Sequence, residues 1–147
     1  MIIKLELVGE RDIRTIKEIL LANKVDAKNM EDEVSKIEKF LFAAKTMENE
    51  VLGCIAIYIV KEIWYKLCEL RLLTTKNNDF ETAKLIIEQA EKIAIENGCK
   101  IMQVAITKGD KFREKAYKKS KFRKVHYFYN LGEVVYLYQK NLTGKKD

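Results

Sequence analysis

The segment between residues 108 and 124 gathers the residue types that bind anions. It holds nine Lys or Arg residues and two acidic residues, a net charge of +7, whereas the whole chain of 147 residues carries +6. The remainder of the chain therefore carries −1. Cations at this density attract phosphate groups. The nine cations are Lys108, Lys111, Arg113, Lys115, Lys118, Lys119, Lys121, Arg123 and Lys124.

Two interpretations of this basic segment follow from the residues alone. Lys111, Lys115 and Lys118 would share one face of a helix, and such a face is most often simply solvated. The alternative is a nucleic-acid surface, in which Phe112, Tyr117 and Phe122 stack on bases between the cations.

Cysteine and histidine do not form a recognisable site. Cys54, Cys68 and Cys99 are odd in number and widely spaced, and His126 is the single histidine, so neither a disulfide framework nor a zinc site is indicated. Each cysteine stands in an apolar stretch, which predicts a buried thiol. His126 falls in a terminal hairpin, where cross-strand packing is the simpler role.

The composition is that of a folded globular protein, with 48% hydrophobic and 34% charged residues and no proline. We expect one domain over residues 1–142 and a flexible tail over residues 143–147. The longest nearly apolar run, residues 51–60, is too short to cross a bilayer. Glu6 and Glu10 argue against a signal peptide, so we expect a cytoplasmic protein without a membrane span.

Apolar periodicity predicts the elements that must position these residues. Strands are expected over residues 2–8, 40–46, 51–63, 64–75, 100–107, 122–129 and 134–140. Helices are expected over residues 10–23, 30–39, 80–97 and 111–120. The order β-α-α-β-β-β-α-β-α-β-β combines an antiparallel meander with a strand-helix-strand crossover, which requires a parallel pair. We therefore predict an α/β fold with a mixed, mainly antiparallel central sheet flanked by helices.

This order of elements resembles that of the GNAT N-acetyltransferase superfamily. VLGCIA at residues 51–56 is similar to the family's third strand, AYKKSKF at residues 116–122 to the end of its fourth helix, and VYLYQKNL at residues 135–142 to its closing strand. The resemblance implies transfer of an acetyl group from acetyl-CoA to an amine of a small molecule or protein. Tyr117 matches the family's tyrosine that protonates the departing thiolate.

The family's phosphate-binding loop is degenerate in this sequence. Its signature positions align on Asn77, Phe80 and Thr82, and its glycines are absent. Asn78 and Glu81 have the spacing of a capping box instead, and Asp79 adds a second carboxylate. The resemblance still implies that acetyl-CoA binds beside the basic fourth helix. The residues that it implies as cofactor contacts are Leu72, Leu73, Thr74, Lys76, Asn77, Asn78, Asp79, Phe80, Glu81, Thr82, Asp110 and Arg113.

The general base and the partners are less constrained by sequence. Glu69 is the nearest carboxylate on the predicted fourth strand and is the candidate for the base, with a surface or paired acid as the alternative. The alternative function is a non-catalytic module of the same fold, with weak or no coenzyme A binding, that contacts a nucleic acid or a protein through its basic helix. The apolar side chains of the terminal hairpin, residues 126–138, indicate a homodimer as one further option.

Overall fold

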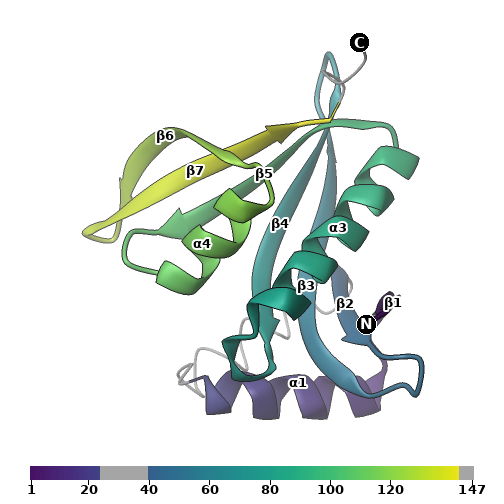
Figure 1. Cartoon of the computed structure of the whole chain (residues 1–147). Coiled ribbons are helices and arrows are strands. Elements are labelled where there is room, and N and C mark those ends of the chain that lie inside the picture. The colour runs from purple at the N-terminus through teal and green to yellow at the C-terminus, as the bar shows by residue number, and fades with distance from the viewer. Residues whose placement is uncertain (24–39, 143–147) are drawn as a thin grey trace.

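The computed structural model describes residues 1–23 and 40–142, and within them seven strands form one sheet. The sheet order is β1-β2-β3-β4-β5-β7-β6, and Figure 1 shows the helices around it. The strands are β1 (Lys4–Leu7), β2 (Leu41–Lys45), β3 (Val51–Lys61), β4 (Lys66–Thr75), β5 (Cys99–Thr107), β6 (Arg123–Asn130) and β7 (Glu133–Asn141). The helices are α1 (Glu10–Ala22), the 3-10 turn η2 (Lys76–Asn78), α3 (Phe80–Glu96) and α4 (Lys111–Lys119).

The predicted fold class is confirmed. β4 and β5 pair in parallel across the α3 crossover, and the other five strand pairs are antiparallel. The strand and helix bounds agree with the predicted ones to within a few residues. The helix predicted over residues 30–39 and the tail predicted over residues 143–147 lie outside the described residues.

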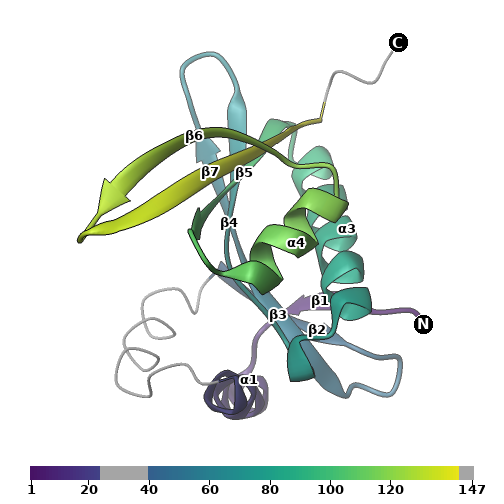
Figure 2. The ribbon, with the colours of Figure 1, turned by 60° about the vertical axis from the view of Figure 1, so that its left-hand side comes forward.

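Alternation along β3 gives the sheet two covered faces. Ile55 and Ile57 pack in one apolar cluster with α3 and α4, whereas Cys54 and Ala56 pack in a second cluster with α1. Figure 2 shows α1 apart from the α3 and α4 pair. A side-chain period of two in a strand dictates this division, since neighbouring residues point to opposite faces.

α3 is held by a continuous buried stripe and ends as its sequence predicts. Its stripe is fully buried and consists of Ala83, Ile86, Ile87, Ala90 and Ala94. Gly98 follows the helix with φ of 78°, and its amide donates a hydrogen bond of 3.0 Å to the Ile95 carbonyl oxygen. Glycine adopts this left-handed conformation without the steric cost that a Cβ brings.

β4 and β5 separate at their C-terminal ends, as Figure 1 shows. Their parallel pairing joins residues 66–70 to residues 99–104 and stops there. Just beyond, Leu72 has a positive φ of 56°, and the register between β3 and β4 shifts opposite Cys54 and Ala56. This β-bulge turns β4 away from β5, while β5 continues beside β7.

Three residues hold the bulge. The Cys54 thiol donates to the Leu72 carbonyl oxygen at 3.7 Å, and the Thr74 hydroxyl donates to the same oxygen at 3.2 Å. Gly53 lets β3 approach closely, because a Cβ there would lie 2.4 Å from the Thr74 carbonyl oxygen. The left-handed Leu72 costs on the order of 1 kcal/mol, so the surrounding contacts must offset it.

Candidate functional site

A cavity of about 410 Å³ occupies the space between the diverging ends of β4 and β5. We call it the strand cleft. β4 contributes residues 69–73 to its wall and β5 contributes residues 104–107. The remaining wall comes from Asp110, Arg113 and Tyr117, on and just before α4, and from Phe128 of β6. Five predicted site residues, Glu69, Leu72, Leu73, Asp110 and Arg113, are therefore brought together with Tyr117.

Tyr117 is the buried polar group of the strand cleft. Its side chain is fully buried and packs edge-on against Phe122, with ring centroids 5.0 Å apart. Its hydroxyl has no hydrogen-bond partner among the described residues. Burial raises the pKa of this phenol well above its ordinary value, and the nearby Arg113 only partly opposes the effect. The hydroxyl therefore stays protonated and has a hydrogen bond to give.

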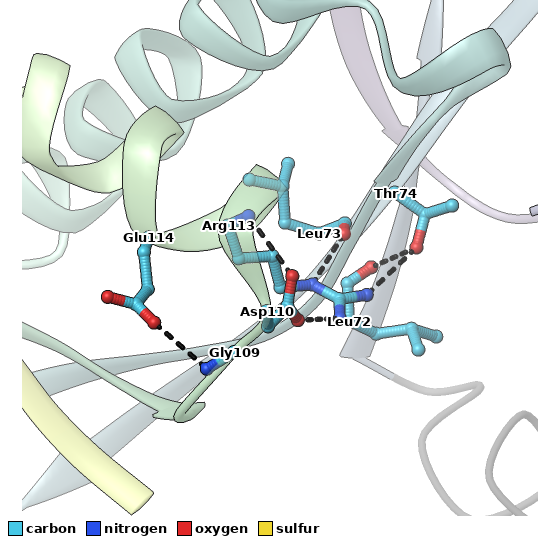
Figure 3. Close-up of polar contacts among 7 residues, drawn as sticks. All are labelled: Leu72, Leu73, Thr74, Gly109, Asp110, Arg113 and Glu114. Carbon is cyan, nitrogen blue, oxygen red and sulfur yellow. Dashed lines mark hydrogen bonds and ion pairs between the residues drawn. The ribbon is translucent and has the colours of Figure 1, made fainter.

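Arg113 ties α4 to the free end of β4, as Figure 3 shows. Its Nε donates to the Leu73 carbonyl oxygen at 2.8 Å, and its Nη2 donates to the Thr74 hydroxyl at 3.4 Å. Its Nη1 forms an ion pair of 2.7 Å with Asp110, whose carboxylate also caps α4 by accepting from the Arg113 amide. The sequence predicted these four residues as cofactor contacts, and they form one polar cluster.

Glu69 lines the same cleft, but its carboxylate is already engaged. It accepts from Arg71 Nε at 3.0 Å and pairs with Arg71 Nη2 at 2.9 Å. The Arg71 guanidinium in turn lies 4.9 Å from the centroid of the Tyr58 ring. The side chain of Glu69 points to the face of the sheet that α1 covers. Its neighbour Leu70 points to the opposite face, where it is buried in the cluster with α3.

The start of α3 borders a second hollow, of about 610 Å³. The predicted phosphate loop lines it, together with Met1 and Leu52, through residues 76–82. Asp79 is the N-cap of α3, since its carboxylate accepts from the Thr82 amide at 3.2 Å and from the Thr82 hydroxyl at 2.5 Å. Lys76 pairs with Glu50 at 3.4 Å.

The capping box predicted from Asn78 and Glu81 is therefore wrong by one position. Asn77 and Asn78 both have positive φ, of 57° and 52°, and belong to the 3-10 turn that precedes the helix. The turn moves the N-cap to Asp79, whose side chain replaces that of Asn78 at the helix amides. Glu81 stays exposed in the first helical turn.

A third hollow, of about 360 Å³, connects the two groups of predicted residues. Leu73, Asp110 and Arg113 from the cleft line it together with Thr74 at the end of β4 and Asn78 from the turn before α3. Sequence reasoning missed Asn23, which also lines it and whose amide donates to the Thr75 carbonyl oxygen at 3.0 Å. Sequence reasoning also missed Phe128, although the side-chain period of two along β6 could have indicated that Phe128 and its neighbours Tyr127 and Tyr129 face opposite sides.

The aromatic residues first considered for base stacking belong to the interior. Tyr117 and Phe122 are buried core residues. Phe112 is partly buried and packs on Phe80, with ring centroids 5.1 Å apart. The alternative in which these three rings stack on nucleic-acid bases is therefore wrong. The predicted burial of the thiols Cys54, Cys68 and Cys99 is confirmed.

Comparisons with known proteins identify the fold. No protein-family model and no curated protein matches the sequence. An acetyltransferase of the GNAT family from Bacillus anthracis superposes with a TM-score of 0.78 at 12% identity, over 97% of this chain and 96% of that one. An N-acetyltransferase from Staphylococcus aureus gives 0.74 at 12% identity, over 97% and 99%.

A chain of the NatC complex, solved with Gag peptide and CoA, gives a TM-score of 0.69 at 14% identity over 97% and 100% of the two chains. These similarities span nearly the whole chain and show its fold. Among the described residues, no helix is long and apolar enough to cross a membrane.

Proposed function

We propose that this chain, which has the fold of the GNAT N-acetyltransferases, transfers an acetyl group from acetyl-CoA to an amine. The observation that carries the proposal is the Tyr117 hydroxyl, buried at the wall of the strand cleft without a partner among the described residues. A buried hydroxyl without an acceptor costs free energy, about 1–3 kcal/mol. A ligand atom that accepts its hydrogen bond would recover that energy.

The strand cleft fits the thioester end of the cofactor. Beyond Leu70 the edge of β4 is separated from β5, so a narrow extended arm would fit beside the backbone of Leu72, Leu73 and Thr74. The Leu73 carbonyl oxygen has a second lone pair beside the one that Arg113 uses. The cleft volume of about 410 Å³ leaves room for such an arm.

The start of α3 fits the phosphate end less well. A helix N-terminus favours an anion through its amides and its dipole, but the Asp79 carboxylate already accepts from the Thr82 amide. Lys76 is the cation at this hollow, and Glu50 pairs with it. We therefore propose weak cofactor affinity, with most of the binding energy coming from the cleft.

The chemistry follows from the protonation states in the cleft. Acetyl-CoA, when bound, supplies an acyl thioester whose leaving group is a thiolate. Burial raises the pKa of Tyr117, so its hydroxyl stays protonated and would donate a hydrogen bond to the sulfur, stabilising the thiolate as the C–N bond forms and the C–S bond breaks. Of the two carboxylates that line the cleft, Asp110 is paired with Arg113 and caps α4. We therefore assign to Glu69 the proton of the attacking amine, although its ion pair with Arg71 must loosen for it to accept.

Asp79 also supports a second candidate function. Its carboxylate stands where a phosphate would bind, and Glu81 adds a further negative charge in the first turn of α3. Such a loop suits a module that has kept the fold and lost the cofactor. In that case acetyl-CoA would not raise the melting temperature of the protein, and the module would act by binding a partner at another surface.

Calorimetric titration with acetyl-CoA and a turnover assay test the proposal. We expect saturable binding of acetyl-CoA. We also expect release of free thiol when polyamines or peptides with a free N-terminal amine are supplied as acceptors. Tyr117→Phe removes only the hydroxyl, so turnover should fall by about 10²–10⁴-fold while affinity for acetyl-CoA changes little. The exposed Tyr65 gives the matched control, Tyr65→Phe. Absence of binding at millimolar acetyl-CoA would overturn the proposal.

Stability provides a second readout for Tyr117. Because its hydroxyl is buried and unpartnered within the described chain, Tyr117→Phe should leave the melting temperature unchanged or raise it. A purely structural tyrosine would instead lose stability. Lower turnover in a variant of undiminished stability separates a role in the reaction from a role in folding.

A further inference from the structure

Six lysines surround a groove of about 560 Å³ between α4 and the β6–β7 hairpin. We call it the lysine groove. Gly109, Glu114 and Tyr136 complete its lining. All six lysines are exposed, and they are Lys108, Lys111, Lys115, Lys118, Lys119 and Lys124. The predicted shared face of Lys111, Lys115 and Lys118 is confirmed, and Lys124 joins it from β6.

Ion pairs among the described residues do not neutralise the positive charge of the lysine groove. Within the described residues none of the six lysines forms an ion pair with a carboxylate. The single acid of the lining, Glu114, accepts from the Tyr138 hydroxyl at 3.3 Å and from the Gly109 amide at 3.2 Å. Ammonium groups around one groove repel one another, and a bound polyanion relieves that repulsion.

Tyrosine rings lie beside these charges. The Lys124 Nζ lies 3.6 Å from the centroid of the Tyr136 ring, which faces α4. Tyr127 pairs with Tyr136 in the β6–β7 register, and Tyr129 pairs with Val134, so both share that face. The two residues are 55% and 72% exposed, and their ring centroids lie 6.3 Å apart.

The hairpin carries this aromatic face outward. Figures 1 and 2 both show β6 and β7 projecting past α4 from the body of the protein. The arrangement therefore continues from a row of cations at α4 to exposed aromatic rings along one side of the hairpin.

We propose that the lysine groove and the adjoining face of Tyr127 and Tyr129 bind single-stranded nucleic acid, DNA or RNA. Lysines that track a phosphodiester backbone beside exposed rings form the two-part surface that unpaired strands require. The rings distinguish this ligand from other polyanions, since a duplex or an acidic peptide has no free bases to stack on them. The stacking residues lie on β6, not on the basic segment where the sequence placed them.

The proposed surface is independent of the strand cleft. Phe128 alternates with Tyr127 and Tyr129 along β6 and lines the strand cleft instead. The two sites therefore use opposite faces of the same hairpin. Nucleic-acid binding does not rest on the proposed acetyl transfer, and it can hold whether or not acetyl-CoA binds.

Fluorescence anisotropy with labelled 12-nucleotide DNA and RNA strands tests the proposal. We expect both strands to bind, with affinity that falls as salt rises by about 0.7 logarithmic units per phosphate contact. Lys118→Gln with Lys119→Gln should reduce that slope by about 1.4. Tyr129→Ala should weaken binding on the order of tenfold without changing the slope, because it removes stacking and no charge.

Matched variants and competing ligands test whether binding is specific to the lysine groove and to unpaired bases. Lys61→Gln with Lys92→Gln removes two exposed lysines elsewhere and should leave binding unchanged. A DNA duplex and a poly-glutamate peptide of equal charge should bind more weakly, and Tyr129→Ala should not affect them. Equal affinity for these ligands, or an unchanged Kd in Tyr129→Ala and Tyr127→Ala, would overturn the proposal.

Coenzyme A supplies the remaining alternative, because its phosphates are anions too. Lys118→Gln with Lys119→Gln should leave affinity for acetyl-CoA within about twofold. If the double variant loses acetyl-CoA and oligonucleotide binding in parallel, the groove is a cofactor subsite and the nucleic-acid proposal fails. If acetyl-CoA does not bind the native chain at all, the oligonucleotide result still stands by itself.

Discussion

The Arg113 Nε donates a hydrogen bond of 2.8 Å to the Leu73 carbonyl oxygen, across the point where β4 has left β5. In a continuous parallel sheet an amide of β5 would satisfy such a carbonyl. Here a side chain from α4 replaces the missing strand partner. The separation of the two strands is therefore stabilised without a ligand, because Arg113 supplies the hydrogen bond that the Leu73 carbonyl oxygen needs.

Replacement of Arg113 should destabilise the fold. Arg113→Ala removes the side-chain donor of the Leu73 carbonyl oxygen and the ion pair of the Asp110 carboxylate, which keeps only the backbone amide of residue 113. We expect the free energy of unfolding to fall by about 1–3 kcal/mol, measured by urea denaturation. Lys111→Ala, at an exposed position of the same helical turn, is the control and should cost little. Equal urea midpoints for the two variants would contradict the role given to Arg113.

Substitution of Asp79 should separate helix capping from anion binding. Asp79→Gly removes the side chain that occupies the Thr82 amide, so affinity for acetyl-CoA should rise severalfold while stability falls by a few tenths of a kcal/mol. Asp79→Asn keeps a good N-cap and removes the charge, so affinity should rise with stability preserved. Titration calorimetry and thermal melting measure the two effects. Weaker acetyl-CoA binding in Asp79→Gly would show that the start of α3 is not the phosphate site.

The buried thiols predict an alkaline loss of stability. Burial raises the pKa of Cys54 and of Cys68 to about 12, from an ordinary value of 9.0. Between these pH values the unfolded chain releases protons that the folded chain keeps, so stability is fully present below about pH 9 and declines toward pH 12. The slope is at most about 1.4 kcal/mol per pH unit for each thiol.

Comparison with Cys54→Ala isolates the contribution of one thiol. Denaturation at a series of pH values should give a shallower alkaline slope in the variant, and both buried thiols should resist alkylation at pH 8 until the protein unfolds. Identical slopes, or rapid alkylation of Cys54 and Cys68 in the folded protein, would be inconsistent with their protected environment.

Gly53 predicts a strong steric effect at the bulge. In Gly53→Ala the new Cβ would meet the Thr74 carbonyl oxygen at 2.4 Å and the Ile86 side chain at 3.2 Å. β4 would have to move, and we expect a loss of about 1–3 kcal/mol in the free energy of unfolding. Denaturant unfolding measures it, and an unchanged midpoint would mean that β3 and β4 can separate there at little cost.

Much of the fold was predictable because it follows from local patterns. Alternation in β3, the apolar stripe of α3 and Gly98 after it each specify an element without reference to the rest of the chain. The parallel pairing of β4 and β5 follows from the helix between them. The aromatic pair Tyr117 and Phe122 indicated the end of α4, and the two rings do pack together.

The site was less predictable because it depends on relations between distant residues. The left-handed Leu72 arises from a register shift against β3, which its own sequence does not encode. The bond from Arg113 to Leu73 spans 40 positions. The N-cap was misplaced by one residue because the turn at Asn77 and Asn78 cannot be distinguished from a capping box by spacing alone. The position of Tyr127 on the same face as Tyr136 could be known only from the β6–β7 register.

β6 gives the protein a free sheet edge, since within the described residues it pairs with β7 alone and all eight of its residues are exposed. Edges of this kind recruit further strands, and cations at the edge are one means of keeping copies apart. Arg123 and Lys124 stand at the start of this strand. Salt screens that repulsion, so colloidal stability should be best in dilute buffer, and concentrated salt should favour clustering of the protein along this edge.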